Sequence, residues 1–516
     1  MAAKLMFYQW LAQGTIGLFV FAFGACAGSF LNVVAYRLPR GLNIVSPPSA
    51  CPKCDTRLGW RENFPIFGWF LLRGKCSHCG VRISPQYVLM ELVVATLFLL
   101  LWALWGMDAR ALASIGIELG PWRPDWAAAP IALMWPMFAL GVVLVGSLVV
   151  STLIDAQTFT IPAVIPWIVM GIAFIAHPVH AHFVAQAGGL NASPFPWTIP
   201  APAGGAAWPF VYAALGGLIG LVIANLLLAF KLIPRSFADF AEWEQQAEAA
   251  FAKAQENAKA AGEPPAEPEG EALGPVLVRT LVLTGPAVAG MIAGTLVLAP
   301  HGKSGLGLAL GGGLGLVVGA VLRSLLVRED GEANSADPIW TQYPHARREV
   351  IKECVFLLPV FALIAAGAWF GAGKALLLED LQTGEIIATA EAPPLWLLAL
   401  GASAMGALVG GGSVWAVRIL GSIAFGKEAM GLGDVHLMAG VGAVLGWIDP
   451  LIAFFVAPFS GIIWALLGPA LGRFVKLPSV LPYGPHLALA TVVVMYAKPL
   501  GEGLLSLVFR SHVNLP

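Results

Sequence analysis

Two aspartates at the edges of apolar segments are the residues of this chain best suited to acid–base chemistry. Asp434 closes the sequence Gly431-Leu432-Gly433-Asp434 at the start of one apolar segment, and Asp155 stands at the end of another. A carboxylate at a membrane edge is costly to desolvate, which makes it a functional candidate. Because Gly431 and Gly433 leave the backbone bare, another chain can approach closely there.

Two carboxylates that meet can hydrolyse a peptide bond without a metal or an activated side-chain nucleophile. One takes a proton from the attacking water while the other, protonated, polarises the scissile carbonyl, and the two share a proton because both cannot easily ionise together. A lone aspartate at a span edge is also commonly an interfacial residue or a helix cap. A transporter that carries protons on these acids is a further alternative.

Four of the six cysteines form a second group. Cys51-Pro-Lys-Cys54 and Cys76-Ser-His-Cys79 are two CxxC pairs with 21 residues between them. Each pair can supply two thiolates from one tight turn, so together they can surround one tetrahedral zinc ion. Two disulfides or a redox pair are the competing interpretations, which a reducing cytoplasmic location disfavours. We predict a closed structural zinc site that builds a small domain and does not catalyse.

The composition indicates the class of protein that must position these residues. Of the 516 residues, 58% are hydrophobic and only 11% are charged, with a mean hydropathy of +0.79. Soluble domains are about 25% charged. We therefore predict an all-α polytopic membrane protein of about 8–12 transmembrane helices with a small cytoplasmic four-cysteine zinc-type domain. We find no basic stripe that would bind nucleic acid. The predicted spans are 14–36, 86–106, 129–153, 161–178, 208–230, 276–299, 305–322, 353–372, 395–417, 434–448, 451–471 and 481–497.

Charge predicts the orientation of these spans. The loop 37–85 carries eight Lys or Arg residues against two acidic ones, whereas 179–207 carries no charged residue. The positive-inside rule places the loop 37–85 in the cytoplasm. Alternation of the spans then brings Asp155 and Asp434 to the same, cytoplasmic, face. The topology did not have to give that result, so it favours pairing the two acids.

We expect four regions along the chain. They are 1–106, with the first spans and the four-cysteine loop (37–85); 129–178, with Asp155; 179–394, an insert with extra spans and a tether (236–272); and 395–497, with the Gly-Leu-Gly-Asp motif.

Two ordered sets of motifs resemble one known family. The N-terminal set is Gly28-Ser29-Phe30-Leu31-Asn32-Val33, Arg37-Leu38-Pro39, both CxxC pairs, Glu62-Asn63, Trp69, Tyr87 and Glu91, and the C-terminal set is Glu428-Ala-Met-Gly431-Leu-Gly433-Asp434-Val, Gly442 and Gly446-Trp447. On these motifs the chain resembles the type IV prepilin peptidases, which are leader peptidase/N-methyltransferase enzymes of the GxGD aspartic protease type. It departs from them in the 279 positions (434 − 155) between the aspartates and in His436, where many members have Lys.

The resemblance implies a function, a substrate and a location. It implies that Asp155 and Asp434 remove a short basic leader from prepilins and pseudopilins of type IV pili and type II secretion, at the cytoplasmic face of the bacterial inner membrane. The cut falls after a glycine, ahead of the pilin's hydrophobic helix. It also implies N-methylation of the new N-terminus with S-adenosylmethionine, although the chain has no independent methyltransferase motif such as a Rossmann glycine loop.

Several points stay open at this stage. The partners that the resemblance implies are prepilin substrates and the lipid bilayer. A non-catalytic pilus assembly factor that only binds leaders is an alternative, since both acids can persist in an inactive geometry. The sequence does not indicate the oligomeric state or the role of the insert.

Overall fold

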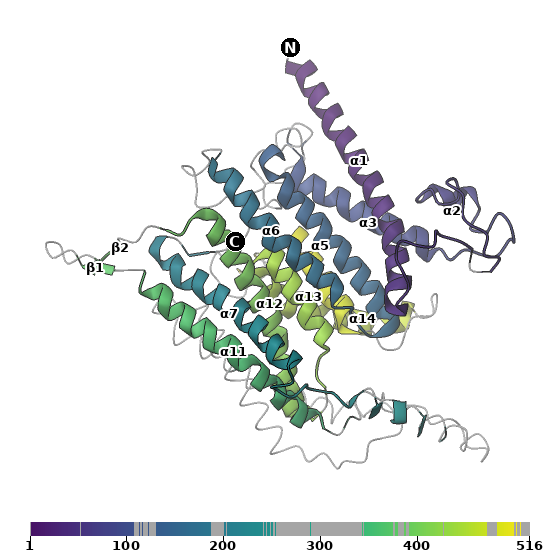
Figure 1. Cartoon of the computed structure of the whole chain (residues 1–516). Coiled ribbons are helices and arrows are strands. Elements are labelled where there is room, and N and C mark those ends of the chain that lie inside the picture. The colour runs from purple at the N-terminus through teal and green to yellow at the C-terminus, as the bar shows by residue number, and fades with distance from the viewer. Residues whose placement is uncertain are drawn as a thin grey trace. The chain divides into compact units, whose positions relative to one another are not determined.

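The described part of the chain is built almost entirely from long apolar helices. The computed structural model describes most of residues 2–107, 131–186, 201–250, 345–374, 392–471 and 482–499, together with two short strands and some isolated positions. Seven helices there are long and apolar enough to cross a membrane, and three shorter ones are apolar. The prediction of an all-α polytopic membrane protein is confirmed. The helices are α1 (Ala2–Arg37), α2 (Phe67–Leu71), α3 (Gln86–Leu101), α5 (Ile131–Thr158), α6 (Val164–Gln186), α7 (Ala207–Ala229), α11 (Ala346–Ala372), α12 (Leu395–Phe425), α13 (Leu432–Leu445), α14 (Ile448–Leu471) and α15 (Tyr483–Tyr496), as Figure 1 shows.

Ten of the twelve predicted spans coincide with one of these helices, and the other two, 276–299 and 305–322, lie outside the described residues. Most of the tether 236–272 also lies outside them. One feature was not predicted: the strands β1 (Leu377–Glu379) and β2 (Ile386–Ala388) pair antiparallel between α11 and α12. Three residues a strand are too few for a recognisable alternation of polar and apolar residues.

The chain divides into two compact units. The first contains Met1–Ile219, Leu363–Ser413 and Leu432–Pro516, and the second contains Gly220–Ala362 and Val414–Gly431. Both candidate aspartates and all four CxxC cysteines belong to the first unit.

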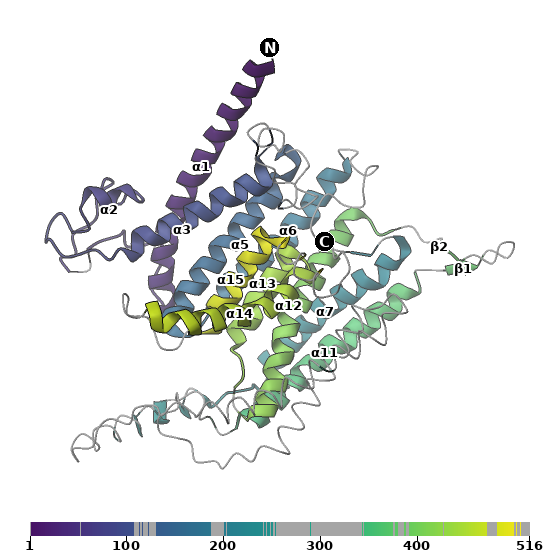
Figure 2. The ribbon, with the colours of Figure 1, turned by 180° about the vertical axis from the view of Figure 1, so that it is seen from behind.

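Small residues let helices of the first unit approach closely. A Cβ atom on Gly24 of α1 would lie 2.7 Å from the Ala95 Cα atom of α3, and one on Gly28 would lie 2.7 Å from the Glu91 Cα atom. On α13, a Cβ atom on Gly440 would lie 3.3 Å from Pro166 of α6. Close contact over small residues is how helices associate in lipid, where burial of apolar surface gives no net gain. The residues between α1 and α3, which include α2, form a small lobe that lies beside the start of α3, as both views show (Figures 1 and 2).

In the second unit, an aromatic cluster joins the segment that follows α7 to the segment that precedes α11. The Tyr343 ring lies 5.3–5.6 Å from the rings of Phe237, Phe240 and Trp243. Its hydroxyl donates a hydrogen bond to the Asp239 carboxylate at 2.6 Å. The first part of the predicted tether (236–272) therefore packs against the segment that leads into α11.

Candidate active site and four-cysteine lobe

Asp155 lies in the last turn of α5 and is only 4% exposed. The backbone N–H of Gly484, at the start of α15, donates a hydrogen bond to its carboxylate. The two groups are so close that a Cβ atom on Gly484 would collide with Asp155 Oδ2, and it would also lie 2.9 Å from Ile161 Cδ1. Glycine at 484 is therefore what allows the backbone amide to reach the carboxylate.

Asp434 lies in the first turn of α13 and is 8% exposed. The Tyr483 side chain lies near enough to interact with the charge on this carboxylate. The preceding residue, Gly433, packs against Ile161, because a Cβ atom at 433 would lie 2.9 Å from Ile161 Cβ. Gly431, the other glycine of the motif, is exposed and belongs to the second unit.

The start of α15 is the common neighbour of the two aspartates. Gly484 contacts Asp155 and Tyr483 interacts with Asp434, while Ile161 packs against both Gly433 and Gly484. The structure thus packs Gly433, beside Asp434, and Gly484, against Asp155, around the same side chain, Ile161.

Tyr483 and Gly484 were missed by sequence reasoning. A signal existed, because Pro482-Tyr483-Gly484-Pro485 is a turn-type sequence directly at the start of a predicted span. The sequence of this turn does not indicate, however, that the Asp155 carboxylate lies against it.

The four predicted zinc ligands come together in the lobe between α1 and α3. Their Sγ atoms all lie within 4.8 Å of one another, and the Cys51 and Cys79 Sγ atoms are 3.7 Å apart. A tetrahedral zinc with bonds of about 2.3 Å would set its sulfur ligands about 3.8 Å apart. The donor set and spacing therefore fit one four-coordinate metal ion.

The two CxxC turns are built alike. The N–H of Cys51 donates to the Thr56 carbonyl at 3.0 Å, and the N–H of Cys76 donates to the Val81 carbonyl at 2.9 Å. In each turn the residue after the second cysteine has a positive φ, 51° at Asp55 and 69° at Gly80. Asp and Gly are among the residues that adopt this conformation most readily, so the sequence supports both turns.

The electrostatics of the lobe favour thiolates at two positions. The hydroxyl and backbone of Thr56 lower the pKa of Cys54 to about 6, and backbone amides of Cys79 and His78 lower the pKa of Cys76. At Cys79 the Val81 amide lowers the pKa, but burial and hydrogen bonds from the other three thiols outweigh it and raise the pKa to about 11. Metal ions bind thiolates, so the lowered pKa values favour metal binding.

Glu62 links the second CxxC turn to the loop that leads from the first CxxC turn to α2. Its carboxylate accepts hydrogen bonds from the Ser77 hydroxyl and, at 2.7 Å, from the Gly59 N–H. These bonds lower the pKa of Glu62, and His78, 3.8 Å away, adds a smaller effect in the same direction. The His78 side chain is exposed.

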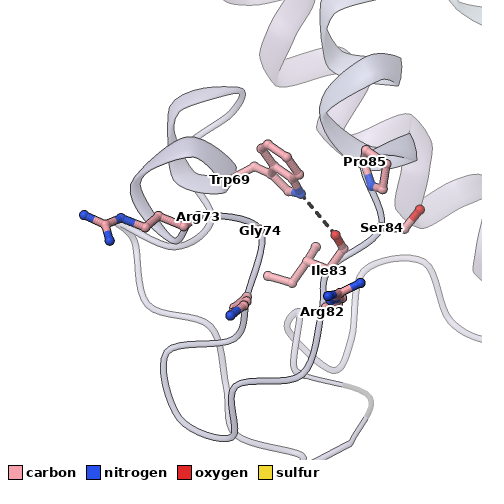
Figure 3. A pocket seen from close by; sticks show the side chains of 8 residues that line it. Trp69, Arg73, Gly74, Arg82, Ile83, Ser84 and Pro85 are labelled. Atoms are coloured by element: carbon pink, nitrogen blue, oxygen red, sulfur yellow. Dashed lines mark hydrogen bonds between the residues drawn. The ribbon is translucent and has the colours of Figure 1, made fainter.

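A pocket of about 400 Å³ lies beside the second CxxC turn, where the lobe meets the start of α3. In Figure 3 the Trp69 indole N–H donates to the Ile83 carbonyl across this pocket at 3.2 Å, and Arg73 points away from it. Arg82 and Lys75 add positive charge to its lining.

The N-terminal motif residues hold this lobe to the α1–α3 helix pair. The buried Glu91 carboxylate of α3 accepts hydrogen bonds from the Ile66 N–H at 2.6 Å and from Ser29 of α1. Asn32 of α1 donates to the Tyr87 carbonyl at 3.2 Å. Ile66 has a φ of 62°, which is strained for a β-branched residue.

These features define a polytopic membrane protein with a four-cysteine lobe and two buried aspartates, one at the end of α5 and one at the start of α13. Residues 22–105 match the family Bacterial Peptidase A24 N-terminal domain, and the resemblance to the type IV prepilin peptidases is confirmed.

Curated relatives carry the name prepilin leader peptidase/N-methyltransferase. The Myxococcus xanthus protein is 37% identical over 144 residues, which are 27% of this chain and 43% of that protein. The Klebsiella pneumoniae protein is 44% identical over 90 residues (16% of this chain, 40% of that protein). The Neisseria gonorrhoeae protein is 30% identical over 177 residues (29% and 52%). The chain thus spans about half or less of the relatives that it matches, and no solved structure matches it.

Proposed function

We propose that this chain is a membrane aspartic endopeptidase that removes the short basic leader from type IV prepilins or pseudopilins. The observation that supports the proposal is that Gly484, which contacts the buried Asp155, and Gly433, which precedes the buried Asp434, both pack against Ile161. The relatives, which are named prepilin leader peptidases, supply the substrate class.

In this proposal Asp155 and Asp434 work as a pair that shares one proton. The ionised member takes a proton from water as the water attacks the peptide carbonyl, and the protonated member donates a hydrogen bond to the carbonyl oxygen. The proton that the first carboxylate has gained then passes to the leaving amine. The Gly484 N–H holds Asp155 in place, and the Tyr483 phenol is a polar neighbour of Asp434.

We further propose that this chemistry takes place at the cytoplasmic face of the bacterial inner membrane. Asp155 is in the last turn of α5 and Asp434 in the first turn of α13. Helices that alternate across the bilayer from a cytoplasmic 37–85 loop put both turns at the inner surface. A basic leader would meet the aspartates there.

The four-cysteine lobe would hold a structural zinc through Cys51, Cys54, Cys76 and Cys79. When bound, such an ion supplies folding energy and no open coordination position, so it takes no part in the hydrolysis. We extend the proposal to N-methylation of the new N-terminus with S-adenosylmethionine, because the names of the relatives pair the two activities.

The test is leader removal by the full chain in lipid vesicles, with a synthetic prepilin that has a basic leader, Gly, Phe and an apolar helix. We expect Asp155→Asn and Asp434→Asn each to abolish cleavage, while Glu242→Gln, at an exposed position, leaves it unchanged. Cleavage that survives in both aspartate variants would overturn the proposal. Binding without cleavage by the unmodified chain would favour an assembly factor, and acid-driven solute uptake would favour a transporter.

A further inference from the structure

A buried charge cluster in the second unit has no role in the chemistry above. Arg418 of α12 is 3% exposed and Glu353 of α11 is 4% exposed. The guanidinium Nη2 atom lies 3.0 Å from Glu353 Oε1, and Nε donates to both carboxylate oxygens at 3.1 and 3.2 Å. A planar guanidinium that contacts both oxygens fixes direction as well as distance.

The remaining nitrogen of Arg418 reaches the segment that leads into α13. Its Nη1 donates to the Glu428 carboxylate and to the Met430 carbonyl. Met430 directly precedes Gly431 of the Gly-Leu-Gly-Asp motif, and Asp434 follows four positions later. One side chain thus connects α11, which lies in the predicted insert, to the backbone that carries the motif.

Other contacts hold this cluster in one arrangement. The Trp415 indole N–H donates to Glu353 Oε2 at 2.6 Å, and the Phe237 ring lies 4.9 Å from the Arg418 guanidinium carbon. The Ser422 hydroxyl accepts a hydrogen bond from the Ala429 N–H at 3.0 Å, a second attachment of the motif segment to α12. The nearby Lys352 is paired with Glu349 at 2.6 Å.

We propose that Glu353 and Arg418 are positioning residues for the segment 428–430, which leads along the chain into the Gly-Leu-Gly-Asp motif. This inference rests on the proposed function in so far as Asp434 is catalytic. Arg418 donates to the carbonyl at 430, four residues before Asp434 along the chain. Glu353 fixes Arg418 and is supplied by a helix that sequence analysis assigned to the insert.

Burial of these charges favours a positioning role over a purely stabilising one. Apolar side chains of similar volume commonly stabilise a fold as well as a buried ion pair does, because burial of charge carries a desolvation penalty. What an ion pair adds is a defined geometry, and a displacement of about 1 Å at a catalytic group can lower a rate about 100-fold.

The experiment uses the full chain in lipid vesicles and two measurements. The first is hydrogen–deuterium exchange of peptides that cover 426–434, and the second is kcat and KM for the synthetic prepilin. The variants are Glu353→Gln and Arg418→Lys, with Trp415→Phe as a milder change that removes one donor to Glu353 and keeps every charge. Glu242→Gln and Arg235→Lys are matched controls at exposed positions of the same unit.

We expect exchange at 426–434 to rise about tenfold or more in Glu353→Gln and Arg418→Lys, and to rise less in Trp415→Phe. We expect kcat to fall about 10- to 100-fold while KM changes less than about twofold, because the substrate still binds. Exchange that matches the controls in all three variants would overturn the inference, as would an equal fall of kcat in the controls.

Hydrogen–deuterium exchange distinguishes a failure of the positioning role from a failure of the proposed function. If the unmodified chain cleaves no prepilin, the proposed function fails, and the exchange data still decide whether Glu353 and Arg418 hold the motif segment. If the unmodified chain cleaves and the variants cleave equally well, the positioning role fails while the proposed function stands.

Discussion

Replacement of Gly484 by alanine is the sharpest test of the candidate active site. The added methyl group would collide with Asp155 Oδ2 and lie 2.9 Å from Ile161 Cδ1. The backbone cannot move freely there, because Gly484 lies in the first turn of α15, between Pro482 and Pro485. The Asp155 carboxylate must therefore give way, and it would lose the hydrogen bond from the Gly484 N–H.

Ordinary contact between a methyl carbon and an oxygen requires the carboxylate to move by about 1 Å. A displacement of this size at a catalytic group costs about 100-fold in rate, which corresponds to about 2.7 kcal/mol in activation free energy. Crowding of a packed site should also lower the stability of the protein, by about 1–3 kcal/mol. We expect the loss to fall mainly on kcat.

The assay is cleavage of the synthetic prepilin by the full chain in vesicles, with folded protein measured in parallel. Gly171→Ala, on α6, is the matched control, because an added Cβ atom there meets no atom within 4 Å. If Gly484→Ala folds, inserts and keeps the kcat of the unmodified chain, the assignment of this turn to the active site is wrong.

Three further predictions concern the lobe and the motif. Cys51→Ser should lower the zinc content of the purified protein from about one ion per chain to near zero, as measured by metal analysis; undiminished zinc would contradict the ligand set. Glu62 has a lowered pKa, so its stabilising bonds to Ser77 and Gly59 are present above the pKa of about 4.3 that it has when unfolded and are lost as pH falls through the lower folded value. Glu62→Gln should therefore increase proteolysis of the lobe at pH 7, and the difference from the unmodified chain should shrink as pH falls below the unfolded pKa and disappear below the lowered folded pKa; a difference that stays constant as pH falls would refute this. Gly433→Ala should lower kcat by about 10-fold or more, since its methyl would lie 2.9 Å from Ile161 Cβ, and prepilin cleavage at the unmodified rate would count against this packing.

Helix positions could be predicted from the sequence because lipid leaves few alternatives to a helix for a long apolar segment. Helix ends could not always be predicted. The span predicted to end at 417 continues to Phe425, because the charge of Arg418 is paired with Glu353 inside the protein. That partner is 65 positions away, so no local rule could have found it.

In the candidate site, too, some residues could be predicted from the sequence and others could not. Each aspartate could be selected from its own surroundings, since a carboxylate at the edge of an apolar segment is uncommon. The four cysteines could be grouped by spacing alone, as the Sγ cluster shows. The roles of Tyr483 and Gly484 could not be predicted from the sequence, because the role of a glycine depends on which group lies opposite its backbone.

The hydrogen bond between Asp155 and Gly484 also sets an order in time. Its donor lies 329 positions (484 − 155) further along the chain than its acceptor. A ribosome that adds about 5–20 residues per second needs roughly 15–65 s to cover that interval. Throughout this period Asp155 is already synthesised but lacks its hydrogen-bond donor, the Gly484 amide. Asp434 is synthesised late in the same period, because it precedes Gly484 by only 50 positions (484 − 434). The contact between Asp155 and Gly484 can therefore form only after the ribosome has passed residue 484, so a shorter nascent chain lacks this part of the candidate site.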